Sequence, residues 1–310
     1  MRMLRLVPLF LVLLLTACTP VPQEFAAEPL PVPSAEPPVL RVALHGSGVV
    51  VRMDIETYVA GVVAGEMPAD WPMAALRAQA ILARTFVLKF ITEKDSRYPG
   101  ADISTDIAEA QAYDADAVNT RILQAVADTR GEVLLTADGD LPYTWFHAHS
   151  GGMTELAAAG LDWQGDEPSH TRVIAGEDSA DAPDSARVWS AEFTVADFLA
   201  ACRSTGADTD GCDVIEVSQK GKSGRAVTLL VNGTAVNAAR LRIALGSTRM
   251  RSTLLTDLRV EDGIIRMAGR GYGHGVGMPQ WGAYALAQQG KSGEEIALHY
   301  YAGLQLVRAW

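Results

Sequence analysis

The stretch Gly65-Glu66-Met67-Pro68-Ala69-Asp70-Trp71-Pro72 and the helix predicted after it organise this chain of 310 residues. Asp70 is predicted to be the N-cap of that helix, with Pro72 in its first turn, where a missing N–H costs nothing. Apolar residues then recur at helical spacing, which predicts one buried stripe made of Met73, Leu76, Ala80, Ala83, Val87 and Phe90. Glu66 is a carboxylic acid set among Gly, Met, Pro and an indole. An isolated Glu is most often solvated, so its importance depends on the rest of the chain.

The N-terminus is typical of an export signal. Arg2 and Arg5 precede an apolar run over residues 6–15, which is too short to span a bilayer. The run ends in Leu15-Thr16-Ala17-Cys18, which resembles a bacterial lipobox and implies removal of residues 1–17 and lipidation of Cys18. A simple secretory signal is the alternative. We expect an exported protein held at the cell envelope by its acyl chains, and Thr19 favours the outer membrane, facing the periplasm, if the cell is Gram-negative.

Residues 18–38 are predicted to be an extended tether. Residues 19–38 hold seven of the fifteen prolines and show no apolar period. The folded domain is therefore expected over residues 39–310, which is long enough for one large domain or for two lobes that share a core. The formal net charge of −11, with no visible stripe of Lys and Arg, argues against a nucleic-acid partner.

The cysteines agree with export. Once Cys18 is lipidated, only Cys202 and Cys212 are left, at the ends of a short polar segment. In an oxidising compartment a disulfide between them is the leading interpretation, and loop closure would stabilise the fold by roughly 3 kcal/mol. Two free thiols are the alternative.

Helical and strand patterns mix along the chain without a regular βαβ rhythm, which favours an α+β fold with small mixed β-sheet elements, a long central helix and a substrate groove between two lobes. Helices are predicted over residues 54–64 and 117–129, besides the one after Pro72. Alternating patterns predict strands over residues 40–44, 49–53, 132–136, 143–148, 214–218 and 226–231. Turns are expected at 45–48, 138–140 and 232–233. Residues 157–187 are predicted to be an acidic surface excursion, and Ser292-Gly293-Glu294-Glu295 a capping box.

A second informative stretch is His147-Ala148-His149-Ser150-Gly151-Gly152, which follows a predicted strand. Ser150 could be a nucleophile, since Ala148-x-Ser150-x-Gly152 comes close to the G-x-S-x-G elbow. His147 and His149 could bind a metal, since alternate strand residues share a face, but a third ligand is not evident. The third interpretation is a polar wall of a binding groove, backed by glycine.

A third stretch, Gly269-Arg270-Gly271-Tyr272-Gly273-His274-Gly275-Val276-Gly277-Met278-Pro279-Gln280-Trp281-Gly282, has glycine at every second position up to Gly277. One face is then bare, so that a ligand or another backbone can approach closely. The stretch does not satisfy G-x-G-x-x-G. Polar side chains and an indole on a glycine scaffold suit a carbohydrate better than a nucleotide. The alternative is a glycine strand that only allows tight packing.

Four segments together resemble the stage II sporulation protein D family, whose relatives include the so-called amidase enhancers. These are Gly65-Glu66-Met67-Pro68; Ala78-Gln79-Ala80 with Ala83-Arg84-Thr85-Phe86; Ser150-Gly151-Gly152-x-Thr154; and Gly271-Tyr272-Gly273-His274-Gly275-Val276-Gly277-Met278-x-Gln280-Trp281-Gly282-Ala283. The resemblance runs from about Leu40 to Tyr301. It differs at Pro279, where Ser is usual, and at Phe86, where Tyr is commoner.

The resemblance implies a lytic transglycosylase that acts on peptidoglycan glycan strands, preferably strands stripped of stem peptides. It places the catalytic acid at Glu66 and an important helix arginine at Arg84. The expected substrate-binding residues are His147, Ser150, Gly151, Gly152, Tyr272, His274, Gln280 and Trp281. Some members hold zinc through Cys and His near the Ser-Gly-Gly segment. Because no Cys lies between Cys18 and Cys202, no metal and no cofactor is expected here.

The chemistry explains why one acid suffices. Ordinary glycosidases use two carboxylates, whereas a lytic transglycosylase lets the 6-hydroxyl of muramic acid attack and form a 1,6-anhydro ring. The glutamate must start neutral, so apolar neighbours such as Met67 and Trp71 should raise its pKa. A nearby Arg84 would oppose that shift, so we expect Arg84 to anchor substrate or stabilise negative charge. Two other functions stay open: a non-catalytic wall-binding module that stimulates an N-acetylmuramoyl-L-alanine amidase, and a serine hydrolase acting through Ser150.

Overall fold

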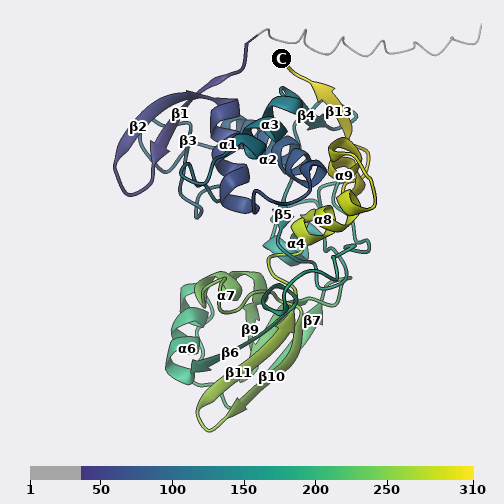
Figure 1. Cartoon of the computed structure of the whole chain (residues 1–310). Helices are drawn as coiled ribbons and strands as arrows, with labels where there is room; N and C mark the ends of the chain where they lie inside the picture. Colours follow the sequence, from purple (N-terminus) through teal and green to yellow (C-terminus); the bar gives the residue numbers. More distant parts are fainter. Residues whose placement is uncertain (1–35) are drawn as a thin grey trace, which may run out of the picture. The chain divides into compact units, whose positions relative to one another are not determined.

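The computed structural model describes residues 36–310. The predicted signal peptide (1–17), Cys18 and most of the predicted tether lie outside the described residues. The described part is a mixed α+β structure with several small sheets (Figure 1), which confirms the predicted fold class. The substrate groove between two lobes stays a prediction. None of the helices in residues 36–310 is both long and apolar enough to cross a membrane.

The long helix α2 (Met73–Glu93) is central to its region, as predicted. It packs against α1 (Ile55–Glu66), α3 (Thr120–Asp128), α8 (Gln280–Gln288), α9 (Gly293–His299) and β4 (Glu132–Leu135). Of the predicted stripe, all but the half-buried Met73 are buried. The prediction for Asp70 is wrong. Pro72 is the N-cap residue, because residues 68–71 form a separate turn in which the Trp71 N–H donates to the Pro68 carbonyl at 3.1 Å.

The predicted N-terminal hairpin is confirmed. β1 (Val39–Leu44) pairs antiparallel with β2 (Val49–Asp54), and β3 (Ile103–Ser104) adds to β1 in parallel. α1 follows directly, with the Asp54 carboxylate accepting the Thr57 N–H at 3.0 Å as its N-cap. The predicted helix over 54–64 therefore exists and extends to Glu66. The predicted helix over 117–129 is also present, but it is shorter, because Asn119 caps it.

A second buried cluster, separate from the one around α2, is built from residues 189–267. One sheet has the order β10 (Leu255–Glu261), β11 (Ile264–Arg270), β6 (Val188–Thr194). The other has the order β7 (Ile215–Lys220), β8 (Ala226–Val231), β9 (Thr234–Asn237), with the turn predicted at 232–233. Helices α6 (Val195–Ser204) and α7 (Ala238–Ala244) bury Phe198 and Leu241 in this cluster. The strands of the first sheet and both helices were not predicted.

Two short pairings join distant parts of the chain. β4 pairs with β13 (Gln305–Arg308), and β5 (Phe146–His147) pairs in parallel with β12 (Met278–Pro279). The predicted strands over 132–136 and 143–148 therefore do not pair with each other, although the turn at 138–140 exists. The second of them shrinks to two residues.

The segment 157–187 is not simply a surface excursion. It contains two short helices, α4 (Ala157–Leu161) and α5 (Asp184–Arg187), and it buries His170, Thr171 and Ser179. Its acidic residues are used internally: the Glu167 carboxylate accepts the N–H groups of Ala157 and Ala158 at 2.7 and 2.9 Å. Acidic composition therefore misled the prediction, because backbone donors inside the fold need acceptors. The predicted capping box is confirmed at the start of α9.

Candidate active site

Glu66 is the last residue of α1 and is half-buried. Its Oε1 accepts the backbone N–H of Ala112 at 2.9 Å, and its Oε2 accepts the side-chain amide of Gln280 at 3.0 Å. The first and third sequence motifs therefore meet at one carboxyl group, although 214 residues separate Glu66 from Gln280. Both donors are uncharged, so the carboxyl group is oriented without an ionic partner.

Gly65 allows this arrangement. A Cβ at this position would lie 2.7 Å from the backbone nitrogen of Tyr113 and 2.9 Å from the carbonyl carbon of Ala112. Such contacts are far shorter than carbon atoms tolerate, so a side chain at 65 would push the 112–113 segment away. The Ala112 N–H would then lose its bond to Glu66. The glycine thus serves a close approach of two backbones.

Burial is the largest influence on the acidity of Glu66 and raises its pKa above the ordinary value, while the two N–H donors oppose the rise. Removal of a carboxylate from water penalises its charged form, whereas hydrogen bonds to it stabilise that form. The direction is the one predicted from the apolar setting. Met67 and Trp71, which flank the turn, are both buried.

An aromatic cluster lies next to this turn. The ring of Trp71 is 4.5 Å from that of Trp281 and 5.2 Å from that of Tyr284, measured between centroids. Trp281 is half-buried and packs against the core around α2. Its indole therefore holds the Glu66 turn against α8 and still keeps part of its surface in solvent. The sugar-stacking role predicted for Trp281 stays a prediction.

The bare face of the glycine-rich stretch is occupied by the chain itself. The backbone of Gly271, Gly273 and Gly277 adopts positive φ, and Cβ atoms there would lie 2.7 Å from the His149 carbonyl oxygen, 2.6 Å from the His147 Cβ and 1.9 Å from the Trp145 carbonyl oxygen. Of the two close partners that the sequence allowed, a ligand or another backbone, the structure contains the backbone. The glycines therefore let the third motif pack directly against the second.

The second motif does not form a serine nucleophile. Ser150 is fully buried, and its hydroxyl donates to the Asp178 carboxylate rather than to an imidazole. His149 is not positioned as its base, because its Nδ1 accepts the Gly151 N–H at 3.0 Å. Asp178 also accepts the N–H of Ser150 at 2.9 Å and that of Gly152 at 3.2 Å. This motif is thus a turn organised around a carboxylate from the 157–187 segment.

His147, which is buried, and His274, which is partly buried, are both held neutral. The Nδ1 of His147 donates to the Val276 carbonyl at 3.1 Å, and burial lowers its pKa well below the ordinary value. His274, whose ring centroid lies 5.5 Å away, accepts the Val276 N–H, and burial lowers its pKa to about 3. Within residues 36–310 no three or more His, Cys, Asp or Glu residues are grouped so as to hold a metal ion. The Arg251 guanidinium lies over the ring of Tyr272, with its Cζ 5.4 Å from the ring centroid.

Arg84 pairs with Glu56 rather than with the candidate acid Glu66. Its side chain is fully buried and pairs with Glu56 in the first turn of α1 at 2.6 Å, whereas Glu66 ends the same helix. Its Nη1 also donates to the Glu132 carbonyl at 2.9 Å. Burial is the main influence on Arg84 and lowers its pKa, which the Glu56 charge opposes. The contacts give Arg84 a role in joining α1, α2 and β4, and the role toward substrate predicted for it stays a prediction.

Sequence reasoning missed three residues near the motifs: Ala112, Asp178 and Arg225. Arg225 is fully buried and donates from Nη2 to the Ser150 carbonyl at 2.5 Å and from Nη1 to the Met153 carbonyl at 3.0 Å. A Cβ on Gly275 would lie 2.4 Å from its Cζ. Each acts through long-range packing or a backbone group, for which no local pattern exists.

Cys202 and Cys212 are free, buried thiols in the structure. Burial raises the pKa of Cys202 to about 11, with a further contribution from the charge of Cys212. The disulfide between them stays a prediction.

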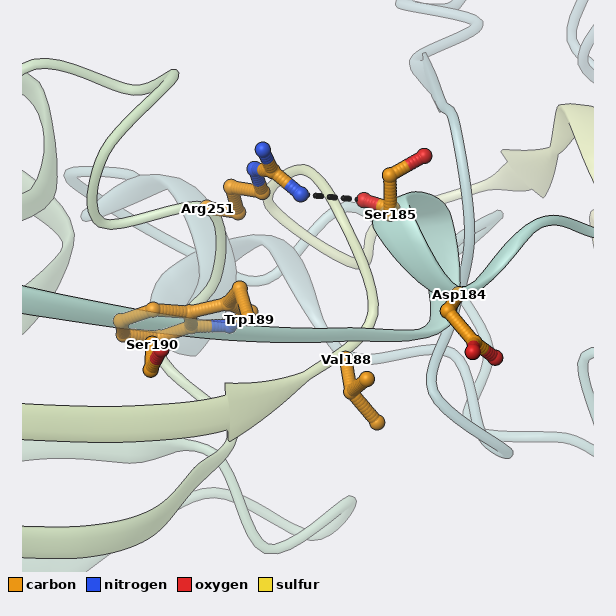
Figure 2. Close-up of a pocket in the computed structure, with 6 residues that line it drawn as sticks. All are labelled: Asp184, Ser185, Val188, Trp189, Ser190 and Arg251. Carbon is orange, nitrogen blue, oxygen red and sulfur yellow. Dashed lines mark hydrogen bonds between the residues drawn. The ribbon is translucent and has the colours of Figure 1, made fainter.

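The structure also has an open cavity of about 480 Å³ at the start of β6 (Figure 2). Asp184, Ser185, Val188, Trp189, Ser190 and Arg251 line it, and the Arg251 guanidinium donates to the Ser185 carbonyl. None of the residues predicted from the sequence lines this cavity. Arg251 connects it to Tyr272 through the ring contact described above.

Comparison with known proteins agrees with the resemblance of the motifs. Residues 44–135 match the family model described as Stage II sporulation protein (SpoIID). The chain is 31% identical over 260 residues to an uncharacterized protein of Brachyspira hyodysenteriae, a match that covers 84% of this chain and 68% of the relative.

Two named relatives come from Bacillus subtilis. Stage II sporulation protein D is 30% identical over 308 residues, covering 95% of this chain and 85% of that protein. The amidase enhancer is 27% identical over 296 residues, covering 79% of this chain but only 40% of that protein. With these matches spanning both the Glu66 and the glycine-rich motifs, the chain belongs to the stage II sporulation protein D family.

Proposed function

We propose that this protein is a lytic transglycosylase that cleaves peptidoglycan glycan strands between N-acetylmuramic acid and N-acetylglucosamine, with Glu66 as its single acid and base. One observation carries the proposal: a half-buried carboxyl group has a raised pKa and only uncharged hydrogen-bond donors. A general acid must be protonated before the reaction, and burial is the usual way to keep a carboxylic acid protonated.

The reaction needs no second carboxylate. Glu66 gives its proton to the glycosidic oxygen as the bond to C1 of muramic acid breaks. The 6-hydroxyl of the same sugar then attacks C1, and the Glu66 carboxylate takes the hydroxyl proton. The products are a 1,6-anhydromuramoyl end and a free 4-hydroxyl on the departing sugar, and the acid is regenerated.

Ala112 and Gln280 keep the carboxyl group in one orientation throughout. Each donates to a different oxygen, and each oxygen retains a lone pair for the substrate. When the carboxylate forms after proton transfer, the same two bonds stabilise its charge. This matches the requirement that catalytic interactions be stronger in the transition state than in the ground state.

The name of one relative suggests a second candidate function. One relative is an amidase enhancer, so this chain would bind the cell wall and stimulate an N-acetylmuramoyl-L-alanine amidase without turnover. Both candidates place the protein at the envelope, which agrees with the predicted export signal and lipidated Cys18. Both also use peptidoglycan glycan strands as the binding partner, and the lytic transglycosylase would prefer strands without stem peptides.

Analysis of products from purified glycan strands tests the proposal. Wild-type protein should produce 1,6-anhydromuramoyl ends, and Glu66→Gln should lower their rate of formation by ~10²–10⁴-fold, because an amide cannot donate the proton. Glu66→Gln should still bind the strands. Asp70→Asn is the matched control: it removes a carboxylate from the exposed part of the same turn and should leave activity unchanged.

Other products would contradict the proposal. Reducing ends would indicate hydrolysis, and released peptides would indicate an amidase or peptidase. Firm strand binding with no cleavage by the wild type would favour the amidase-enhancer candidate, which co-incubation with an amidase then tests directly.

A further inference from the structure

A cluster of aromatic rings lies outside both buried cores. The centroids of Tyr143 and Trp145 are 5.3 Å apart and the rings are stacked, while Trp163 lies 5.8 Å from Tyr143 and 5.3 Å from Trp145. Neither core cluster includes any of the three. Trp145 and Trp163 are half-buried. Tyr143 is buried and packs on Phe86 of the α2 core, with ring centroids 5.6 Å apart, so the two tryptophans are the rings of this cluster that are partly open to solvent.

These rings line a cavity of about 220 Å³ that also has polar walls. Lys89 and Glu93 come from the end of α2, and Asp140 comes from the turn after β4. The hydroxyl of Tyr143 is buried, and burial together with the neighbouring Glu93 carboxylate raises its pKa.

Charge at the cavity favours a neutral ligand. Lys89 is paired with Glu93, and the ammonium groups of Lys89 and Lys94 lie 5.6 and 5.1 Å from the centroid of Tyr143. The position that a cationic ligand would take over this ring is therefore already filled. The remaining Asp140 carboxylate is unfavourable to an anion. Aromatic faces combined with hydrogen-bonding carboxylate and hydroxyl groups suit a pyranose ring, which has apolar faces and a rim of hydroxyls.

The cavity is linked to the Glu66 site through one strand pair. The Trp145 carbonyl accepts the Met278 N–H at 3.2 Å, and the Ala148 carbonyl accepts the Trp281 N–H at 3.0 Å. Ala148, which binds the first turn of α8, is three residues after Trp145, a distance of about 10 Å along an extended chain. His170, whose Nε2 donates to the Tyr143 carbonyl at 2.9 Å, fixes the other wall.

We propose that this aromatic cavity is a second saccharide-binding site, separate from the Glu66 carboxyl group, that takes one N-acetylated pyranose ring of a glycan. The choice of an amino sugar rests on the proposed function. The ring stacks on the exposed part of Trp163 or Trp145, and its hydroxyls bond to the Asp140 carboxylate. The site binds and holds a strand, and it takes no part in bond cleavage.

Titration of the full chain carrying Glu66→Gln with chitotetraose, a β-1,4-linked oligomer of N-acetylglucosamine, tests this site without turnover. Calorimetry gives the affinity, and the indole N–H signals report which tryptophan is contacted. Trp163→Ala should weaken binding at this site ~10-fold, since a lost aromatic contact of that size corresponds to about one decade. Trp163→Phe should recover part of it, and Asp140→Asn should also weaken binding.

Matched controls come from the same loops. Gln164→Ala, next to Trp163, and Asp138→Asn, in the same turn as Asp140, change residues that do not line the cavity, and both should bind as the parent does. The buried Trp189 gives an indole signal that should not move. Thermal unfolding of each variant separates a lost contact from a lost fold.

The proposal is overturned if the Trp163 signal stays fixed while that of Trp281 moves, because the sugar then binds only near Glu66. It is also overturned if only strands that still carry stem peptides bind, because the cavity then recognises a peptide. Failure of the proposed function is a different result. A wild type without turnover, together with binding that depends on Trp163, would leave the saccharide site in place and remove the catalytic role of Glu66.

Discussion

Glu66 makes the protein less stable at neutral pH than a neutral side chain would. Its folded pKa is raised above the ordinary value of 4.5. Below that value the carboxyl group is protonated in both the folded and the unfolded chain. As pH rises toward the folded pKa, the unfolded chain releases the proton first, so the free energy of unfolding falls through this window and stays lowered above it.

We therefore predict that Glu66→Gln unfolds at a higher temperature than the wild type at pH 7, and that the difference shrinks toward zero below about pH 4.5. Thermal unfolding followed by circular dichroism across this range measures it. Asp70→Asn gives the baseline for an exposed acid in the same turn. Parallel curves for Glu66→Gln and wild type would mean that burial does not shift the Glu66 pKa.

Arg84 stabilises the fold through a buried ion pair, and this gives a second prediction. Arg84→Met leaves Glu56 in the interior without its cation, which typically lowers the free energy of unfolding by about 3–5 kcal/mol. Glu56→Gln combined with Arg84→Met should recover much of the loss. Denaturant unfolding measures both.

Arg77→Met is the matched control on the same helix, because Arg77 and Asp128 form a partly exposed pair, which is worth at most about 1 kcal/mol. A variant of Arg84 that keeps its stability and loses glycan cleavage would instead support the substrate-anchoring role predicted from the sequence.

At the scale of elements, the glycine-rich stretch holds β12 against β5. Gly277 has a φ of +70°, and a Cβ there would lie 1.9 Å from the Trp145 carbonyl oxygen. We predict that Gly277→Ala lowers the free energy of unfolding by at least about 2 kcal/mol, because backbone strain adds to the lost strand pairing. Denaturant unfolding measures the loss.

Gly290 provides the comparison. It also has a positive φ, +87°, but nothing lies within 4 Å of a Cβ there. Gly290→Ala should therefore show only the conformational strain, about 1 kcal/mol. Equal losses for the two variants would show that the close approach to Trp145 is unimportant.

At the scale of the whole molecule, attachment to the envelope is predicted to depend on one atom, the Cys18 sulfur. Cys18→Ser should prevent lipidation. The protein should then move from the membrane fraction to the soluble fraction, because no acyl chain is left to hold it at the membrane. Fractionation and intact-mass measurement check this. Cys202→Ser also removes one thiol and should stay with the membrane. A Cys18→Ser protein that still pellets with membranes would point to another anchor.

The elements that the sequence predicted are those with local causes. The hairpin of β1 and β2, the turn at 232–233 and the capping box of α9 depend on residues a few positions apart. The buried stripe of α2 was predicted because its apolar period is complete within the helix itself. Asp70 failed as a cap because neighbouring residues closed a separate turn first.

Strand partners and the surroundings of the candidate site required the tertiary structure. Pairings such as β4 with the C-terminal β13, or β11 with β6, join segments far apart in the chain, and no local pattern specifies a partner at that distance. The same reason applies to Asp178 beneath Ser150 and to Arg84 beside Glu56.

The sequence by itself determined the family motifs and the residue types of the site: a carboxylic acid in an apolar turn, an amide and an indole on a glycine-rich stretch. Only the tertiary structure decided that Gln280 and the Ala112 backbone bind the Glu66 carboxyl group while Arg84 pairs elsewhere. The physical reason is that a hydrogen bond needs two groups within about 3 Å, and folding alone determines which distant residues come that close.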